Sequence, residues 1–354
     1  MTTVRAVGGP IATPGVAPAG TARPPRGLRP ALSRRSTRSA GVAIGLVSAM
    51  CFGTSGAFGT ALIGAGWSPA GAVLARVGVA ALALTVPALL ALRGRWRVLR
   101  RSAWQVTVYG LVGVAACQVC YFNAIARMPV GISIMLEYLG IVLIVLWLWV
   151  RHGQTPRPLT IGGGVAALGG LGLMLNLTGT GGVSLTGVLF ALTAAVSMAV
   201  YFFQSAATQG TSGEANATAG VAAGSSADDP GDLPPVVLTW GGMIVGAAAI
   251  ALVGAVRVMP LRFSGADVAL FGGRTSWIVP VLGLGVVAAA IAYVTGIGAA
   301  RRLGPKFGSF VAMAEIGFAV LFAWILLHQT PTATQFVGGA LILAGVIAVR
   351  LDEP

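Results

Sequence analysis

Two glutamates, Glu137 and Glu315, are the side chains of this sequence that most strongly suggest a functional role. Each lies deep inside an apolar run long enough to cross a bilayer. None of the other acidic residues lies deep inside such a run. An ionisable side chain at the centre of a membrane helix costs about 2.5–3.5 kcal/mol on insertion scales, so a functional role is the first hypothesis. That role would be proton coupling or binding of a substrate ammonium group. The alternative is a structural hydrogen bond between helices.

The composition places most of the chain in lipid. Of the 354 residues, 56% are hydrophobic and only 9% are charged, with a mean hydropathy of +0.87. A soluble protein carries about 25% charged residues. The net charge of +14 comes from basic residues clustered in short segments between apolar runs, where they orient membrane spans. We therefore expect an all-α polytopic membrane protein, and no nucleic-acid partner, since no nucleic-acid-binding motif accompanies the charge.

Apolar runs of about 20 residues, the length that a bilayer demands, predict the elements that carry the two glutamates. We expect ten transmembrane helices, at residues 41–63, 69–92, 105–126, 129–150, 159–177, 184–206, 235–256, 277–300, 304–327 and 332–350. Residues 1–40 are rich in Arg, Pro and Gly and are expected to form a disordered cytoplasmic tail. Residues 207–234 are acidic and rich in Gly, Ser and Ala, which predicts a flexible linker between the sixth and seventh helices.

The distribution of Arg predicts the orientation. With the N-terminus in the cytoplasm, the outer segments hold only Arg127, Arg257, Arg262 and Arg274, and most other basic residues fall inside. The positive-inside rule favours this arrangement. We expect a multi-pass protein of the cell membrane with both termini in the cytoplasm.

The two halves of the chain resemble each other in sequence. The only two histidines open equivalent motifs, and similar Gly-Gly and Tyr positions lie around them. The matching pairs are His152-Gly153-Gln154-Thr155-Pro156 with His328-Gln329-Thr330-Pro331, Gly163-Gly164 with Gly338-Gly339, and Tyr121 with Tyr293. We expect two five-helix repeats, at 41–177 and 184–350. An odd number of spans per repeat inverts the second, as in secondary transporters, and places Glu137 and Glu315 near the membrane midplane.

Other polar residues within the spans could contribute to a site. Arg76 is the one basic residue inside a span, and it could pair with a glutamate, face an anionic substrate group, or extend to the membrane surface. A solute site needs a few polar groups among apolar walls. Further candidates for such a site are Tyr121, Asn123, Tyr138, Tyr201 and Tyr293.

Metal, cofactor and enzymatic chemistry find no support in the sequence. The three cysteines, Cys51, Cys117 and Cys120, lie in apolar runs and are interpreted as small core residues. The histidines are expected on opposite membrane faces, where they cannot share a metal. Because no nucleophile–base pair is visible, we expect neither an enzyme nor a cofactor. A channel would carry charged rings or a filter loop, which we do not find.

Several of these motifs resemble the EamA-type family of the drug/metabolite transporter superfamily, most closely its threonine/homoserine exporters. The resemblance rests on Pro129-Val130-Gly131-Ile132 with Leu136-Glu137-Tyr138, on Arg302-Leu303, Phe307-Gly308-Ser309 and Met313-Ala314-Glu315, on Ala75-Arg76, and on the Gly-rich last span. It implies ten helices in two repeats, a central cavity and export by alternating access. The sequence departs from the family where Pro usually follows each glutamate, and where Gly-Glu usually precedes Thr-Pro.

The function we expect is secondary active transport. The chain would export small amino-acid-like or other metabolites by proton-coupled alternating access, with the solute, protons and the lipid bilayer as its partners. The alternative is a non-transporting or channel-like protein in which the two glutamates are structural. The sequence leaves open whether the chain acts alone or as a homodimer.

Overall fold

The computed structural model describes residues 31–94, 96–140, 142–143, 149–150, 157–175, 184–209 and 233–352. The first half of this part of the chain is helical throughout. Its elements are α1 (Ala31–Gly64), α2 (Pro69–Leu92), α3 (Trp96–Arg101), α4 (Ala103–Val108), η1 (Tyr109–Ala116), α5 (Cys117–Ile125), α6 (Val130–Tyr138) and α8 (Pro158–Leu175).

The second half adds a small hairpin to its helices. Its elements are α9 (Leu185–Gln209), α10 (Pro235–Ala255), β1 (Val268–Leu270), β2 (Gly273–Thr275), α11 (Ile278–Leu282), η4 (Gly283–Ile291), α12 (Ala292–Ala312), α13 (Ala314–Leu327) and α14 (Ala333–Asp352). Strands β1 and β2 pair antiparallel, with Val268 opposite Thr275. The turn between them uses positive φ angles at Phe271 and Gly272.

Five of the described helical stretches are long and apolar enough to cross a membrane. Four shorter apolar helices accompany them. The long stretches are Ser39–Gly64, Pro69–Leu92, Ala103–Ile125, Pro235–Ala255 and Ile278–Leu303, and the shorter ones are Pro158–Leu173, Leu185–Ala199, Ala314–Leu327 and Ala333–Val349. The chain is therefore a helical multi-pass membrane protein. The fourth expected span, 129–150, is described only in part, and the count of ten stays a prediction.

The structure corrects two expected boundaries. Helix α1 begins at Ala31, although disorder was expected through residue 40; residues 31–40 contain neither Gly nor Pro, so the helix of the first span can extend into them. Helix α12 continues to Ala312, past the loop expected at 301–303, and the break comes at Met313. Residues 1–30 and 210–232, which hold most of the expected tail and linker, lie outside the described residues.

Within the described residues, two segments of π-helix interrupt otherwise regular helices. Segment η1 joins α4 to α5, and η4 joins α11 to α12. Aligning Tyr121 with Tyr293 shifts the numbering by 172, which carries η1 from 109–116 to 281–288 and onto η4 at 283–291. The irregularity thus occurs at equivalent places in the two halves. Such bulges are frequent at functional sites.

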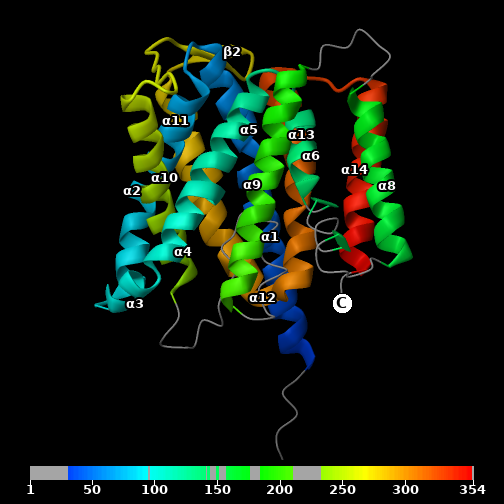
Figure 1. Cartoon of the computed structure of the whole chain (residues 1–354), viewed down its shortest axis with the longest axis horizontal. Coiled ribbons are helices and arrows are strands. Elements are labelled where there is room, and N and C mark those ends of the chain that lie inside the picture. Colours follow the sequence, from blue (N-terminus) through cyan, green and yellow to red (C-terminus); the bar gives the residue numbers. More distant parts are fainter. Residues whose placement is uncertain are drawn as a thin grey trace, which may run out of the picture.

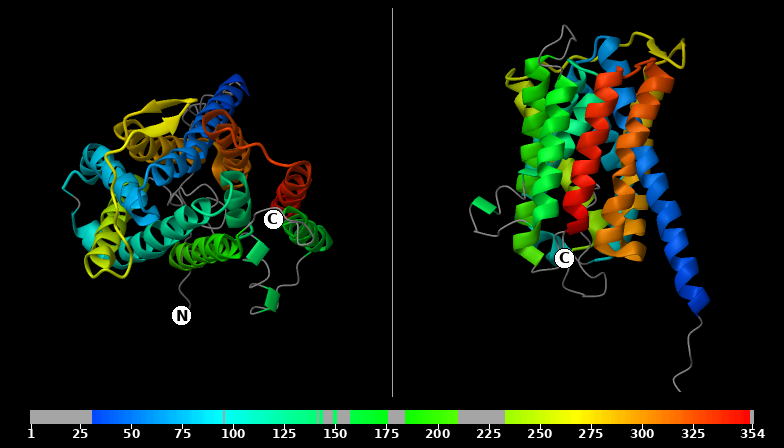
Figure 2. Two further views of the ribbon diagram at one scale, coloured as in Figure 1. Left: turned by 90° about the horizontal axis from the view of Figure 1, so that it is seen from above. Right: turned by 90° about the vertical axis from the view of Figure 1, so that its right-hand side faces the viewer.

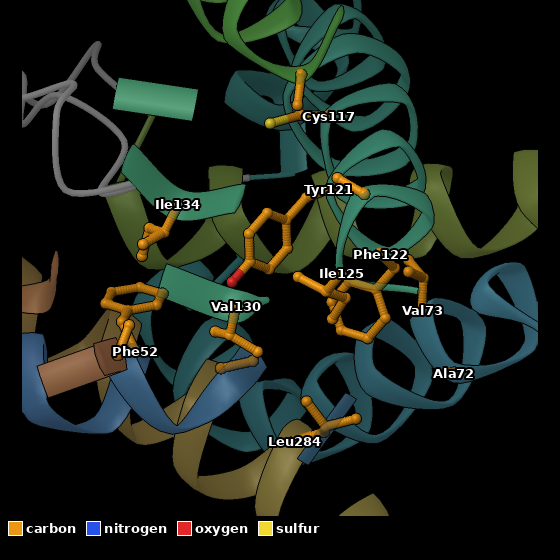
Figure 3. Close-up of a cluster of buried hydrophobic side chains, with 14 of the residues drawn as sticks. Phe52, Ala72, Val73, Cys117, Tyr121, Phe122, Ile125, Val130, Ile134 and Leu284 are labelled. Carbon is orange, nitrogen blue, oxygen red and sulfur yellow. The ribbon is translucent and has the colours of Figure 1, made fainter. Parts of the chain in front are cut away.

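The helices form one bundle around a buried apolar core (Figures 1 and 2). The β-hairpin caps one end, whereas the start of α1 and the end of α14 both lie toward the other end. Figure 3 shows part of the core, where Phe122 of α5, Val73 of α2 and Leu284 of η4 meet, each fully buried. Core residues from both halves therefore form a single hydrophobic unit.

Helices α8 and α14 pack closely against each other at one side of the bundle (Figure 1). Glycines permit the approach, because a Cβ on Gly163 would lie 2.6 Å from the carbonyl oxygen of Gly345, and one on Gly170 would lie 2.5 Å from that of Gly338. Small residues of this kind let membrane helices approach closely. The pairing joins the last apolar helix of each half.

Candidate functional site

Helix α6 positions Glu137 in its last turn. The helix starts directly after Pro129, and Val130, Leu136 and Tyr138 are buried against the rest of the bundle. The Cys117 thiol, at the start of α5, donates a hydrogen bond to Glu137 Oε1 at 3.3 Å. Glu137 thus faces the junction where η1 becomes α5.

Helix α13 positions Glu315 in its first turn, directly after the break at Met313. The Tyr138 hydroxyl of α6 donates a hydrogen bond to Glu315 Oε2 at 3.1 Å. Tyr138 follows Glu137 in the sequence, so α6 carries one of the two carboxyl groups and donates a hydrogen bond to the other. The two glutamates, 178 positions apart in the chain, therefore lie on packed neighbouring helices.

The ends of these two helices that lie away from the glutamates are also connected. The backbone N–H of Val130, at the start of α6, donates to Oε1 of Gln329, which lies just beyond the end of α13, at 3.2 Å. The bond satisfies one of the N–H groups that a helix N-terminus leaves without an intrahelical partner. One side chain therefore links the beginning of the Glu137 helix to the end of the Glu315 helix.

Arg76 of α2 lies inside the protein with 4% of its surface exposed. Its guanidinium donates to Gln118 Oε1 of α5 at 2.5 Å and to the carbonyl oxygen of Ala288, within η4, at 3.0 Å. Its Cζ also lies 5.9 Å from the ring centroid of Phe122. Both hydrogen bonds go to neutral acceptors, so the positive charge remains available to the carboxylates nearby.

Electrostatic interactions join the three ionisable groups into one cluster. Glu315 interacts with Glu137 and with Arg76, and Glu137 also interacts with Arg76. Each glutamate nevertheless retains a partly accessible surface. Among the described members of this cluster Arg76 is the one cation, so the cluster is neutral when one of the two carboxyl groups carries a proton.

Two tyrosines border the cluster. Tyr121 interacts electrostatically with both glutamates and with Arg76. Its hydroxyl approaches α1, where a Cβ on Gly56 would lie 2.7 Å from the oxygen (Figure 3). Tyr293, at the start of α12, is 5% exposed, packs edge-to-face on Phe52 at 5.0 Å between ring centroids, and shares a side-chain hydrogen bond with Tyr109.

Two other candidates are placed differently or are not described. The Asn123 amide donates to the carbonyl of Val119 at 2.8 Å, and its oxygen accepts from exposed Arg127 at 3.0 Å, so its contacts are local to the end of α5. The side chain of Tyr201, on α9, lies outside the described residues. The structure thus brings together Glu137, Glu315, Arg76, Tyr121, Tyr138 and Tyr293.

Sequence reasoning missed three members of the cluster. Gln118 accepts from Arg76, Cys117 donates to Glu137, and Tyr109 bonds to Tyr293. Gln118 could have been predicted as a site residue, because it is a polar residue in the middle of an apolar span. Cys117 was interpreted as a small core residue, and it is buried, but its spacing from Cys120 says nothing about Glu137. Chemically, the set can hold a proton on a carboxyl group and can offer both signs of charge to a polar solute.

These features define a class of helical membrane protein with an ionisable cluster assembled from both halves of its chain. The model of the EamA-like transporter family matches residues 39–176 and 215–351, more than half of the chain, and the chain therefore belongs to that family. Its members are membrane transporters of the drug/metabolite superfamily. The family matches twice, which establishes two repeats, and α9 lies between the matched stretches.

A solved structure supports the fold. It is described only as "Crystal structure of protein" and aligns with a TM-score of 0.54 at 21% identity, covering 89% of this chain and 97% of the other. At this identity the likeness concerns the fold alone. No curated protein matches the chain.

Proposed function

We propose that this chain is a secondary active transporter that exports small amino-acid-like or other metabolites by proton-coupled alternating access. Membership of a transporter family supports the general class. The observation that carries the finer proposal is the pairing of Glu137 and Glu315 on adjacent helices from the two halves, around the buried Arg76.

The charges of this cluster suit the proposed chemistry. An amino-acid-like solute carries an ammonium and a carboxylate, which the glutamates and Arg76 could contact respectively. A carboxyl group that exchanges a proton for the ammonium group would couple the two movements, because both are positive charges competing for one anion. Outward movement of solute would then accompany inward movement of protons.

The proposed mechanism also needs a part of the protein that changes its arrangement. Helix α6 ends at Tyr138 and α13 starts after Met313. The regular helix is therefore interrupted within two residues of each glutamate. Transporter sites are often built at such discontinuous helices, between two inverted repeats. We propose that the halves are inverted, that ten helices cross the cell membrane, and that both termini are cytoplasmic.

Flux measurements test this proposal. Purified protein in liposomes would be given a panel of labelled amino acids and cationic metabolites, with and without an imposed pH gradient. We expect uptake of at least one solute that depends on the gradient and is lost in Glu137→Gln or Glu315→Gln. Gradient-independent flux in the wild type, unchanged in both variants, would favour a channel-like protein with structural glutamates.

A further inference from the structure

The exposed side of α3 and the start of α4 combine dense positive charge with two large aromatic side chains. The tryptophans Trp96 and Trp104 are 49% and 76% exposed. The arginines around them, all exposed, are Arg93, Arg97, Arg100 and Arg101. This set, called the α3 surface below, lies at the end of the bundle where α1 begins (Figure 1).

Packing on the opposite side of α3 fixes which residues face outward. Val98 and Leu99 pack against a small apolar cluster that includes Leu92 of α2 and Val106 of α4. The chain enters α3 through a sharp turn, in which Arg93 and Gly94 have φ angles of 32° and 82°. Residues 96 and 100, like 97 and 101, are four apart and so share a side of the short helix. The arginines therefore face away from the protein.

The neighbouring helices supply no counter-charge. No Asp or Glu precedes Glu137 in the sequence, so the whole stretch from α1 to α5 is free of acids. Tryptophan is enriched where a membrane protein meets the lipid head groups, because its ring is apolar and its N–H is polar. Exposed Trp beside Arg side chains with no acid on α1 to α5, at the end of a membrane helix, is the pattern expected for a contact with charged lipid.

We propose that the α3 surface binds the phosphate groups of anionic phospholipids in the leaflet that meets this end of the bundle. A guanidinium forms paired hydrogen bonds with phosphate oxygens. Clusters of basic residues beside a membrane helix are attracted to anionic lipid, and the attraction is screened by salt. The two tryptophans anchor the surface at the depth of the head groups. This binding is independent of the transported solute.

A competing occupant exists within the chain. Asp228, Asp229 and Asp232 precede Leu233, which lies in the same apolar cluster as Leu92 and is 9% exposed. Their carboxylates could pair with the arginines in place of lipid. That pairing would leave Trp96 and Trp104 unexplained, which is why we favour lipid, but the experiment must separate the two.

Native mass spectrometry of detergent-purified protein, incubated with phosphatidylglycerol or phosphatidylcholine, measures the retained lipid. The test variant is R97Q/R100Q/R101Q. The matched control is R257Q/R262Q/R274Q, which removes the same charge from exposed positions near the hairpin at the other end. We expect the wild type and the control to retain phosphatidylglycerol in preference to phosphatidylcholine, and the test variant to bind on the order of tenfold less. W96A/W104A should also reduce retention with every arginine in place.

Three outcomes would overturn the proposal. The wild type could retain both lipids equally at low salt, or the control could lose as much phosphatidylglycerol as the test variant. A third is that D228N/D229N/D232N retains far more phosphatidylglycerol than the wild type, which would show that the linker occupies the arginines. The comparison within the wild type, between lipids and across salt concentrations, does not depend on any variant folding.

Discussion

The guanidinium of Arg76 connects parts of the bundle that are distant in sequence. It reaches Gln118 on α5 and the Ala288 carbonyl in η4 with two different nitrogens, Nη1 and Nη2. A guanidinium reaches two separated acceptors with two nitrogens held in one plane, whereas a lysine ammonium presents all its donors from a single nitrogen. Geometry at this residue therefore contributes to the fold as well as to the charge of the cluster.

Replacing Arg76 by Lys should destabilise the protein while keeping its charge. We expect a loss of about 1–3 kcal/mol, because at least one buried acceptor loses its donor. Thermal unfolding in detergent would measure the loss, with Arg274→Lys, at an exposed position, as the control that changes little. Equal unfolding temperatures for the two variants would contradict a stabilising role for the two hydrogen bonds of the Arg76 guanidinium.

The thiol of Cys117 should contribute through its hydrogen bond to Glu137 and not through volume alone. Cys117→Ala is expected to lower stability by about 1 kcal/mol more than Cys120→Ala, a similar truncation one helical turn away. Cys117→Ser, which keeps a donor, should recover part of the difference. If the Ser and Ala variants unfold alike, the bond to Glu137 contributes nothing measurable.

At the scale of the helix, the π-helical segment η4 supports the Arg76 contact. A π-helix leaves carbonyl groups out of the regular hydrogen-bond pattern. In and after η4 two such oxygens accept from side chains of other helices: that of Ala288 from Arg76, and that of Ala292 from Ser48 of α1 at 2.7 Å. The irregular backbone thus provides polar attachment points within an apolar core.

The contact between α8 and α14 offers a test with adjacent glycines. Gly163→Ala should cost about 1–3 kcal/mol, because its Cβ would meet the Gly345 carbonyl at 2.6 Å and the helices would have to separate. Gly162→Ala, where nothing lies within 4 Å, should be neutral or stabilising by up to about 1 kcal/mol through helix propensity. Unfolding midpoints in the opposite order would contradict the packing.

The sequence predicted the apolar helices better than their irregularities. Hydropathy locates α2 and α10 within a residue or so of their ends. It carries no signal for η1 or η4, because a π-helix has the same apolar composition as the α-helix around it. The break at Met313 is equally invisible, since no Gly or Pro stands there. The glutamates and Arg76 were identified because charge is rare in a span, whereas their partners depend on which helices are neighbours.

At the scale of the whole molecule, the two halves are held together by packing. Helix α1 packs on α12 and α13, α2 on α10 and η4, and α8 on α14. These contacts bury residues of both halves in one core. Each of these contacts also joins a helix before residue 210 to one after residue 232. The covalent connection between α9 and α10 is therefore expected to matter less for the assembly than this packing does.

Cutting the chain between residues 210 and 232 tests this expectation. A protease site placed there should yield two fragments that copurify after cleavage and keep at least half of the intact protein's flux. The same site placed between Gly56 and Gly59, in the middle of α1, serves as the contrast and should prevent folding. Fragments that separate after cleavage in 210–232 would mean that the connection, not the packing, holds α1–α9 and α10–α14 together.

In the proposed mechanism, Glu137 and Glu315 couple solute movement to protons. The most direct measurement compares two modes of transport in liposomes: exchange of solute at equal concentration on both sides, and accumulation driven by a pH gradient. In Glu137→Gln or Glu315→Gln we predict that accumulation is lost while exchange persists, because Gln keeps the shape of the side chain but cannot bind or release a proton. Accumulation at the wild-type rate in both variants would contradict the claim.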